Sequence, residues 1–156
     1  MAIHYTIRKT CTADLDAVMD IYAYARSFMA AHGNPRQWGA TCWPPRQLIE
    51  KDIAVGKSYV CVTDDQETGQ EKICAVFYYD FGAAPEAGYA GITQGGWKSD
   101  APYGVVHRIA AAEGTRGAGS FCLGWAYEKS GHMRIDTHPD NTVMQSMLKK
   151  LGYSYC

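Results

Sequence analysis

The sequence predicts an α/β fold with a mixed central sheet and helices on both of its faces. Two strand-like runs, 58–64 and 72–80, follow each other with only a polar turn between them, which indicates antiparallel pairing. Further along, a strand-like run at 103–112, a helical segment at 119–130 and a short run at 133–138 form a β-α-β unit. Such a unit predicts a parallel strand pair joined by a right-handed crossover.

The first part of the chain adds one strand and two helices. Residues 3–10 alternate enough for a first strand, and 12–33 carry apolar residues at helical spacing. Thr12 fits the N-cap of this helix and Gly33 its end, and 46–56 predict a shorter second helix. The apolar stripe of the first helix consists of Leu15, Val18, Met19, Tyr22, Ala25, Phe28 and Met29.

Two more helices are predicted in the second part of the chain. The helix at 119–130 is followed, after the run at 133–138, by a last helix within 139–152. The Gly-rich segment 81–102 is irregular, and loops of that length commonly serve a function. No repeat or low-complexity tract divides the chain, so a single domain over 1–156 is expected. The apolar faces consist of Phe121, Cys122, Trp125 and Ala126, and of Val143, Met144, Met147, Leu148 and Leu151.

Composition argues against several classes of function. The formal net charge of -1 gives no general attraction to nucleic acid or to anionic membranes. No apolar run approaches the roughly 20 residues of a membrane helix, and the N-terminus turns polar too early for a signal peptide. The six cysteines contain no C-x-x-C pair, so we expect reduced thiols in a cytoplasmic protein. Asp136, His138 and Asp140 are of metal-ligand type but lack a recognised spacing, and no metal site is predicted.

The stretch "EGTRGAGS", 113–120, joins a predicted strand to a predicted helix through three glycines. A loop that turns directly into a helix leaves backbone N–H groups that favour an anion, above all phosphate. Gly117 and Gly119 would let the backbone approach such a ligand, and Arg116 adds a positive charge. A tight turn without a ligand explains the glycines equally well.

Two other phosphate motifs do not fit this stretch. The nucleotide P-loop needs Lys and then Ser or Thr after its last glycine, whereas Ser120 and Phe121 follow Gly119 here. The dinucleotide fingerprint opens the first β-α unit with three glycines, whereas "GAGSFC" lacks the third and lies late in the chain.

The stretch "VVHRIAAAEGTRGAGSFCLGWA" resembles the coenzyme A loop of the GNAT superfamily of N-acetyltransferases. The family's motif is Arg or Gln, two residues, Gly, one residue, then Gly or Ala, and it opens a helix after a strand. Phe121 stands at the last small position. A second block, "IDTHPDNTVMQSMLKKLGY", resembles the family's fifth strand and the helix after it. Leu148 stands where many members carry a tyrosine that acts as the general acid toward the leaving thiolate.

The resemblance implies a cosubstrate, acetyl-CoA, and a place for it. The fourth and fifth strands would be parallel and splayed, with the pantetheine arm between them against backbone of Ile109, Ala110 and Ala111. Residues Gly117, Ala118, Gly119 and Ser120 would hold the pyrophosphate beside Arg116. Asn141 would bond the pantetheine arm or the acceptor.

Acetyl transfer to an amine needs a group that takes a proton from the ammonium. His107 lies on the fourth predicted strand, and its ordinary pKa near 6.5 suits this role. Tyr103 shares its strand parity and is a second candidate. A hydrogen-bonded structural histidine beside Arg108 is the alternative reading. Trp38, Trp43 and Trp97 lie in irregular segments and either wall the acceptor pocket or cover the core.

Three functions remain open at this point. The first is an N-acetyltransferase acting on a primary amine of a small molecule or a protein. The second is a catalytically weak coenzyme A-binding sensor or scaffold of the same fold, and the third is a nucleotide phosphate-binding domain. The family usually continues with one or two more strands, whereas only "YSYC" follows Gly152. These C-terminal strands are therefore expected to be short or missing, and the open sheet edge predicts a homodimer or a further strand.

Overall fold

The computed structural model describes residues 3–39, 42–86, 89 and 96–155. A four-stranded sheet in the order β1-β2-β3-β4 forms its centre, and every neighbouring pair is antiparallel. The strands are Thr6–Lys9 (β1), Ser58–Asp64 (β2), Glu71–Gly82 (β3) and Tyr103–Ala111 (β4). The predicted antiparallel pairing of the first strands is therefore confirmed.

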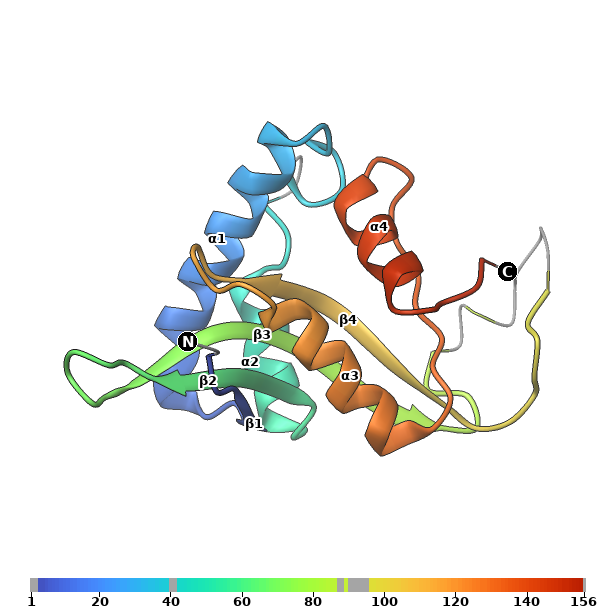
Figure 1. Cartoon of the computed structure of the whole chain (residues 1–156), viewed down its shortest axis with the longest axis horizontal. Coiled ribbons are helices and arrows are strands. Elements are labelled where there is room, and N and C mark those ends of the chain that lie inside the picture. The colour runs from blue at the N-terminus through green and yellow to red at the C-terminus, as the bar shows by residue number, and fades with distance from the viewer. Residues whose placement is uncertain (1–2, 40–41, 87–88, 90–95, 156) are drawn as a thin grey trace.

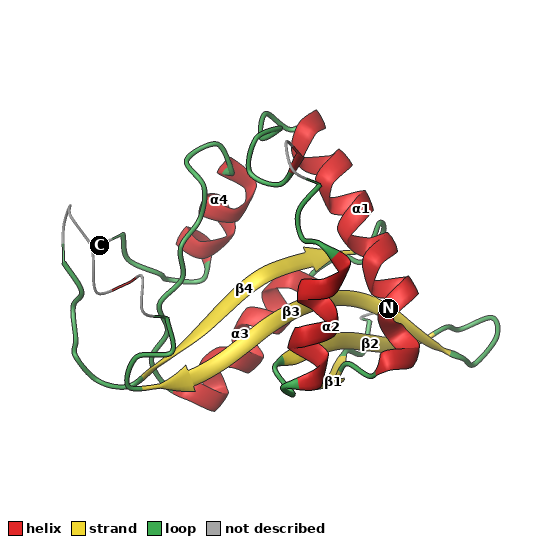
Figure 2. Ribbon diagram, turned by 180° about the vertical axis from the view of Figure 1, so that it is seen from behind, coloured by secondary structure: helices red, strands yellow, loops and turns green. Residues whose placement is uncertain are grey.

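Helices lie on both faces of the sheet, as predicted. Figures 1 and 2 show α1 (Leu15–Ala31) and α2 (Arg46–Ala54) on one face and α3 (Ala118–Ser130) on the other. The last helix, α4 (Thr142–Lys150), stands beside β4. Among the described helices, none combines the length and the apolar character that crossing a bilayer requires.

The two faces of the sheet bury separate apolar clusters. Period-two alternation along β2 sends Val60 to the cluster under α1 and α2, and Cys61 to the cluster under α3. Tyr22 and Ile49 are almost fully buried in the first cluster, and Phe77 is fully buried in the second. Each such side chain contributes about 1.5–3 kcal/mol of hydrophobic stabilisation. The cysteines Cys61, Cys74 and Cys122 are buried free thiols.

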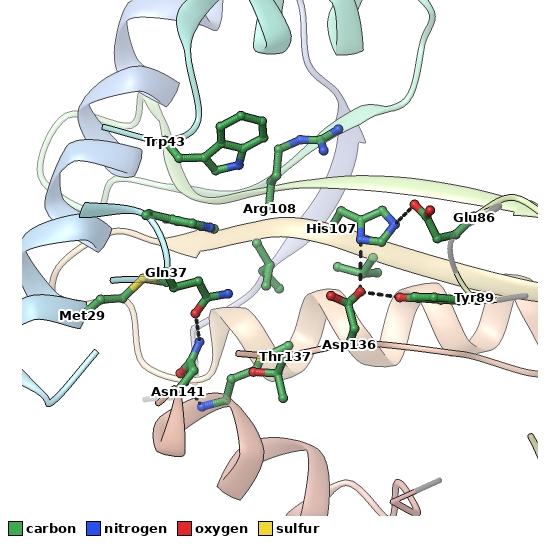
Figure 3. Close-up of a pocket in the computed structure, with 14 residues that line it drawn as sticks. Met29, Gln37, Trp43, Glu86, Tyr89, His107, Arg108, Asp136, Thr137 and Asn141 are labelled. Atoms are coloured by element: carbon green, nitrogen blue, oxygen red, sulfur yellow. Dashed lines mark hydrogen bonds and ion pairs between the residues drawn. The ribbon is translucent and has the colours of Figure 1, made fainter. Parts of the chain in front are cut away.

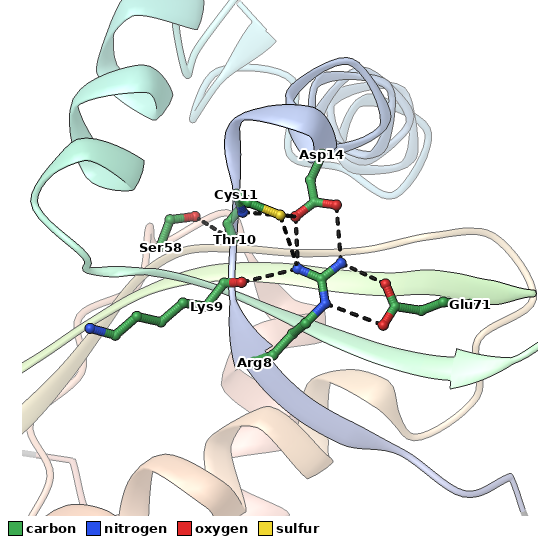
Figure 4. Close-up of polar contacts among 7 residues, drawn as sticks. All are labelled: Arg8, Lys9, Thr10, Cys11, Asp14, Ser58 and Glu71. Atoms are coloured by element: carbon green, nitrogen blue, oxygen red, sulfur yellow. Dashed lines mark hydrogen bonds and ion pairs between the residues drawn. The ribbon is translucent and has the colours of Figure 1, made fainter.

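A polar network fastens the start of α1 to the sheet (Figure 4). The Arg8 guanidinium donates to both carboxylate oxygens of Asp14, at 2.8 and 3.0 Å, and to Glu71 on β3. Asp14 also accepts from the N–H of Cys11, so a 3-10 turn over Thr12–Asp14 precedes the α-helix. Arg8 holds the pKa of the Asp14 carboxyl well below its usual range. Thr12 is therefore not the N-cap that the sequence predicted: it is the first residue of this turn, which Cys11 caps, and α1 begins at Leu15.

The predicted parallel strand at 133–138 is not formed. Among the described residues, this segment pairs with β4 through a single parallel bridge between Gly104 and Met133. The Gly104 N–H donates to the His132 carbonyl at 2.8 Å, and the Arg134 N–H donates to the Gly104 carbonyl at 3.0 Å. A Cβ on Gly104 would overlap the Ser130 side chain, so this close approach needs glycine. Because the ladder stops there, most of the outer edge of β4 stays open.

Candidate acetyl-transfer site

A cavity of about 520 Å³ lies along the open edge of β4. Residues of β4, of the end of α1 and the loop after it, of segment 136–137 and of α4 line it (Figure 3). A cavity of this volume is in the range of small-molecule sites. Its polar lining includes Glu86, His107, Arg108, Asp136 and Asn141.

His107 lies between two carboxylates in this cavity. Its Nε2 is 3.3 Å from Oε2 of Glu86, and its Nδ1 is 3.7 Å from Oδ1 of Asp136. The buried Nε2 makes no aligned hydrogen bond within the described part of the chain. Burial lowers the pKa of His107 below its ordinary value of 6.5, although the two carboxylates oppose the shift. The imidazole is therefore neutral near pH 7 and able to accept a proton.

Asp136 is held by a tyrosine from the long irregular segment. The Tyr89 hydroxyl donates a short hydrogen bond to Oδ1 of Asp136, the same oxygen that faces His107. Burial and this carboxylate raise the pKa of Tyr89, so its hydroxyl keeps its proton at any physiological pH. Tyr89 thus orients Asp136 toward the imidazole.

A bulge in β4 separates His107 from Ile109, Ala110 and Ala111, the residues for which the resemblance predicts coenzyme contacts. Val76 pairs with Ala110 and Tyr78 with His107, so two residues of β4 oppose one of β3. Arg108, one of the two, has a positive φ of 52°, which is uncommon for any residue but glycine. Its carbonyl accepts from the Tyr22 hydroxyl at 2.7 Å.

The guanidinium of Arg108 is bound to a carboxylate on α2. Its guanidinium makes three hydrogen bonds of 2.9–3.1 Å to the carboxylate of Asp52 on α2, and it lies 4.7 Å from the Tyr78 ring centroid. Both side chains of the pair are largely buried, at 16% exposed for Arg108 and 6% for Asp52. These contacts hold the strained backbone at the bulge.

The backbone of β4 beyond the bulge partly matches the predicted coenzyme contacts. The Ala112 N–H donates to the Cys74 carbonyl, so the backbone of Ala112 faces β3. Alternation along the strand then turns the N–H and C=O groups of Ile109 and Ala111 to the open edge. Ala110 instead pairs with Val76, and its side chain is buried under α1.

The glycine turn leads directly into α3. Gly117 is the N-cap residue, with a positive φ of 80° that favours glycine. Within the described part of the chain, the N–H groups of Gly119 and Ser120 have no acceptor. Ala118 is buried beneath the turn, and Arg116 is exposed beside it. Free N–H groups, a helix N-terminus and an exposed arginine are thus brought together at the position where the sequence predicts anion binding.

Asn141 caps α4 at the rim of the cavity. Its Oδ1 accepts from the Met144 N–H at 3.0 Å, and its Nδ2 donates to Oε1 of Gln37 at 3.1 Å. The residue therefore lies where the resemblance predicted a ligand contact, while its side chain serves the helix end.

The three tryptophans of the irregular segments divide between two sites. Trp38, which packs edge-on against Tyr22, and Trp43 both line the cavity. Trp97 lies elsewhere: its indole N–H donates to the Tyr89 carbonyl, and the Arg134 guanidinium stacks on its ring.

Tyr103 shares a face of β4 with His107 but does not line the cavity. It is 3% exposed and packs in a cluster with Tyr89 and Val105. Its hydroxyl is 3.4 Å from the Glu86 carbonyl, and Arg134 stacks on its ring. In this structure Tyr103 supports the segment that carries Glu86 and Tyr89.

Comparison with solved structures identifies the family. An acetyltransferase of the GNAT family from Streptococcus agalactiae is 30% identical, covers 99% of this chain and 90% of its own, and superposes with a TM-score of 0.78. The chain belongs to the GNAT family of acetyltransferases. Acetyl transfer is accordingly its general activity.

Other solved structures agree in fold at lower identity. An acetyltransferase of the family from Listeria monocytogenes is 14% identical over 99% of this chain and 88% of its own, with a TM-score of 0.69. An aminoglycoside 6'-N-acetyltransferase from Acinetobacter haemolyticus is 15% identical over 96% and 91%, with a TM-score of 0.59. No protein-family model matches the sequence, and no curated protein matches it either.

The sequence did not predict that three residues of this site lie close together. They are Glu86, Tyr89 and Asp136. Tyr89 and Asp136 lie 47 residues apart in the chain, and no local pattern connects them. One usable signal was the aspartate itself, since "MRIDTH" places a carboxylate in a strand-like run directly after the β-α unit.

Proposed function

We propose that this protein is an N-acetyltransferase that moves the acetyl group of acetyl-CoA to a primary amine. Family membership supports acetyl transfer in general, and the donor and the acceptor are the added proposal. The observation that carries it is His107, a neutral imidazole between two carboxylates in a cavity on the open edge of β4.

The glycine turn and the open strand edge suit coenzyme A. The unpaired N–H groups of Gly119 and Ser120, together with the α3 dipole, would bind the pyrophosphate. Arg116 would add a positive charge at the same end of the helix. Backbone groups of Ile109 and Ala111 would bond the pantetheine arm, which directs the thioester toward His107.

His107 would accept a proton from the acceptor ammonium, which frees the nitrogen lone pair. The nitrogen attacks the thioester carbonyl carbon, so a C–N bond forms and the C–S bond breaks. A backbone N–H at the β4 bulge would stabilise the charge on the carbonyl oxygen. As the C–S bond breaks, the nitrogen releases its second proton to water, and the proton on His107 passes to the leaving thiolate, directly or through water, which restores the neutral imidazole.

A second candidate function is coenzyme A binding with little turnover. The observation that favours it is Leu148, a buried residue at the position where many members of the family carry a tyrosine acid. Leu148 packs in the cluster under α3 and does not line the cavity of His107.

Two measurements separate these functions. Thermal unfolding with acetyl-CoA, ATP or NAD is expected to show stabilisation by acetyl-CoA alone, by about 2.7 kcal/mol at a concentration one hundred times the dissociation constant. Thiol release from acetyl-CoA is then followed with a panel of amines. Amine-dependent release supports the enzyme, and binding without release across the panel supports the sensor. Stabilisation by ATP and not by acetyl-CoA contradicts both.

A further inference from the structure

The charges that line the cavity are unbalanced. Among the described lining residues, Glu86 and Asp136 are the carboxylates and Arg108 is the guanidinium. Asp52 neutralises Arg108 through three hydrogen bonds, and Figure 3 shows the Arg108 guanidinium pointing away from Asp136. Two negative charges therefore remain at the cavity.

Both carboxylates can meet a ligand. The Glu86 side chain is 37% exposed and that of Asp136 66%, whereas the imidazole between them is 18% exposed. Burial lowers the pKa of His107, so the imidazole supplies no compensating positive charge near neutral pH. Two negative charges thus flank the position that the reacting amine must reach.

No cation of the neighbouring loop changes this balance. The sequence from 87 to 95, "AGYAGITQG", contains no Lys, Arg or His. Arg36, on the loop that carries Gln37, pairs with Asp140 at 2.9 Å. Among the described cations beside the cavity, Arg36 and Arg108 are therefore ion-paired, and Arg26 is exposed and donates to the Trp43 carbonyl at 3.2 Å.

The opposite wall of the cavity also suits a cation. Trp38 and Trp43 line it, and Trp43 is 38% exposed. Indole faces attract ammonium groups by about 0.5–2 kcal/mol, depending on how far the cation is desolvated. An acceptor in this cavity would lie between indole rings and carboxylates.

We infer that the acceptor is a small amine with a second cationic nitrogen, which stays charged while the first is acetylated. The reacting ammonium, or the imidazolium formed when His107 takes its proton, balances only one of the two carboxylates. A second ammonium on the acceptor balances the other. This inference rests on the proposed function and narrows its acceptor to diamines and polyamines, against mono-amines and amino acids.

The test uses three probes of equal chain length: cadaverine, n-pentylamine and δ-aminovalerate. Their far ends carry a cation, a methyl group and a carboxylate. Binding is measured by calorimetry to the protein saturated with coenzyme A, where no acetyl group can be transferred. We expect cadaverine to bind about tenfold more tightly than pentylamine, the effect of one charge-assisted contact, and aminovalerate to bind most weakly.

The variant Glu86→Gln tests the source of this preference. It should reduce the advantage of cadaverine over pentylamine to about threefold or less, because one carboxylate is gone. The matched control is Glu128→Gln on the exposed face of α3, outside the cavity, which should keep the full preference.

Turnover with acetyl-CoA is measured separately with the same probes. Selective cadaverine binding without turnover contradicts the proposed acetyl transfer and leaves the cation site standing. Turnover in which pentylamine or aminovalerate equals cadaverine overturns the inference and leaves the enzyme standing. An unchanged preference in Glu86→Gln and Asp136→Asn, with both variants folded by circular dichroism, overturns the inference as well.

Discussion

At the scale of single residues, His107 combines burial with two carboxylate neighbours, and this combination sets its chemistry. Burial makes the charged imidazole costly, while Glu86 and Asp136 limit that cost. The result is a histidine that is neutral at rest and can still hold a proton briefly. A base of this kind suits an amine that arrives protonated.

The direct test of this role is His107→Gln. Glutamine keeps hydrogen-bonding capacity but cannot take a proton, so we expect turnover to fall by about 10²–10⁴-fold with coenzyme A affinity unchanged. Steady-state kinetics and calorimetry measure the two quantities. Turnover within about twofold of the parent protein would remove His107 from the mechanism.

The same residue predicts a pH dependence of stability. The folded pKa lies below the ordinary 6.5, so the unfolded chain binds more protons as the pH falls through that value, and the free energy of unfolding decreases. Above pH 6.5 this contribution is constant. Urea unfolding from about pH 8 to pH 5 should show a steeper loss in the parent protein than in His107→Gln. Parallel curves would contradict the lowered pKa.

Asp52→Asn tests the contacts that hold the bulge. It leaves the Arg108 guanidinium buried without its carboxylate, so we expect a loss of about 3 kcal/mol in the free energy of unfolding, together with reduced turnover. The control Asp16→Asn removes an exposed ion pair with Arg46 and should cost less than about 1 kcal/mol. Equal small losses would show that the buried pair does not stabilise the bulge.

At the scale of elements, periodicity predicted the order of the helices and of the first four strands, and it did not predict two features of the site. The run at 133–138 has the composition of a strand, yet its backbone pairs with β4 only at Gly104. Asp136 in this run instead binds the Tyr89 hydroxyl and faces the cavity. The bulge at Arg108 depends on Asp52 and Tyr22, which lie 56 and 86 residues away in the chain. Sequence periodicity reports local geometry and carries no information on such distant contacts.

The glycine turn is the element that the sequence predicted best, and Gly119→Val tests it. A Cβ at Gly119 would meet only the Met147 side chain, at 3.5 Å or more, so the fold should tolerate the change. The larger side chain would obstruct the proposed phosphate site at the N-terminus of α3, and we expect coenzyme A affinity to fall at least about tenfold.

Gly124→Val is the matched control for this variant. It lies in the same helix, and a Cβ there would meet nothing within 4 Å. The coenzyme A affinity of Gly124→Val should equal that of the parent protein. Equal affinities in both variants would exclude the turn from coenzyme binding.

At the scale of the whole molecule, the backbone of the 133–137 segment pairs with only one strand, β4, among the described residues. Toward β4 it makes a single bridge, and its other side borders a second, largely apolar hollow of about 810 Å³. Three buried polar atoms around it lack partners in the described part of the chain: Nδ1 of His132, Nε of Arg134 and Oγ1 of Thr137. An edge of this kind is a template for pairing with another chain.

We therefore expect a second copy to cover this edge. Light scattering should report a dimer, and the amides of 133–137 should exchange slowly with solvent in it. A monomer at high concentration whose segment amides are nevertheless protected would contradict this expectation.

The central claim is that an acetyl group moves from coenzyme A to an amine nitrogen in the cavity of His107. The most direct measurement uses acetyl-CoA with a carbon-labelled acetyl group and cadaverine, with the product analysed by mass spectrometry and NMR. We predict a labelled mono-N-acetyl product that accumulates with the parent protein and is nearly absent with His107→Gln. Label that stays on coenzyme A or appears only as free acetate, or equal product from both proteins, would contradict the account.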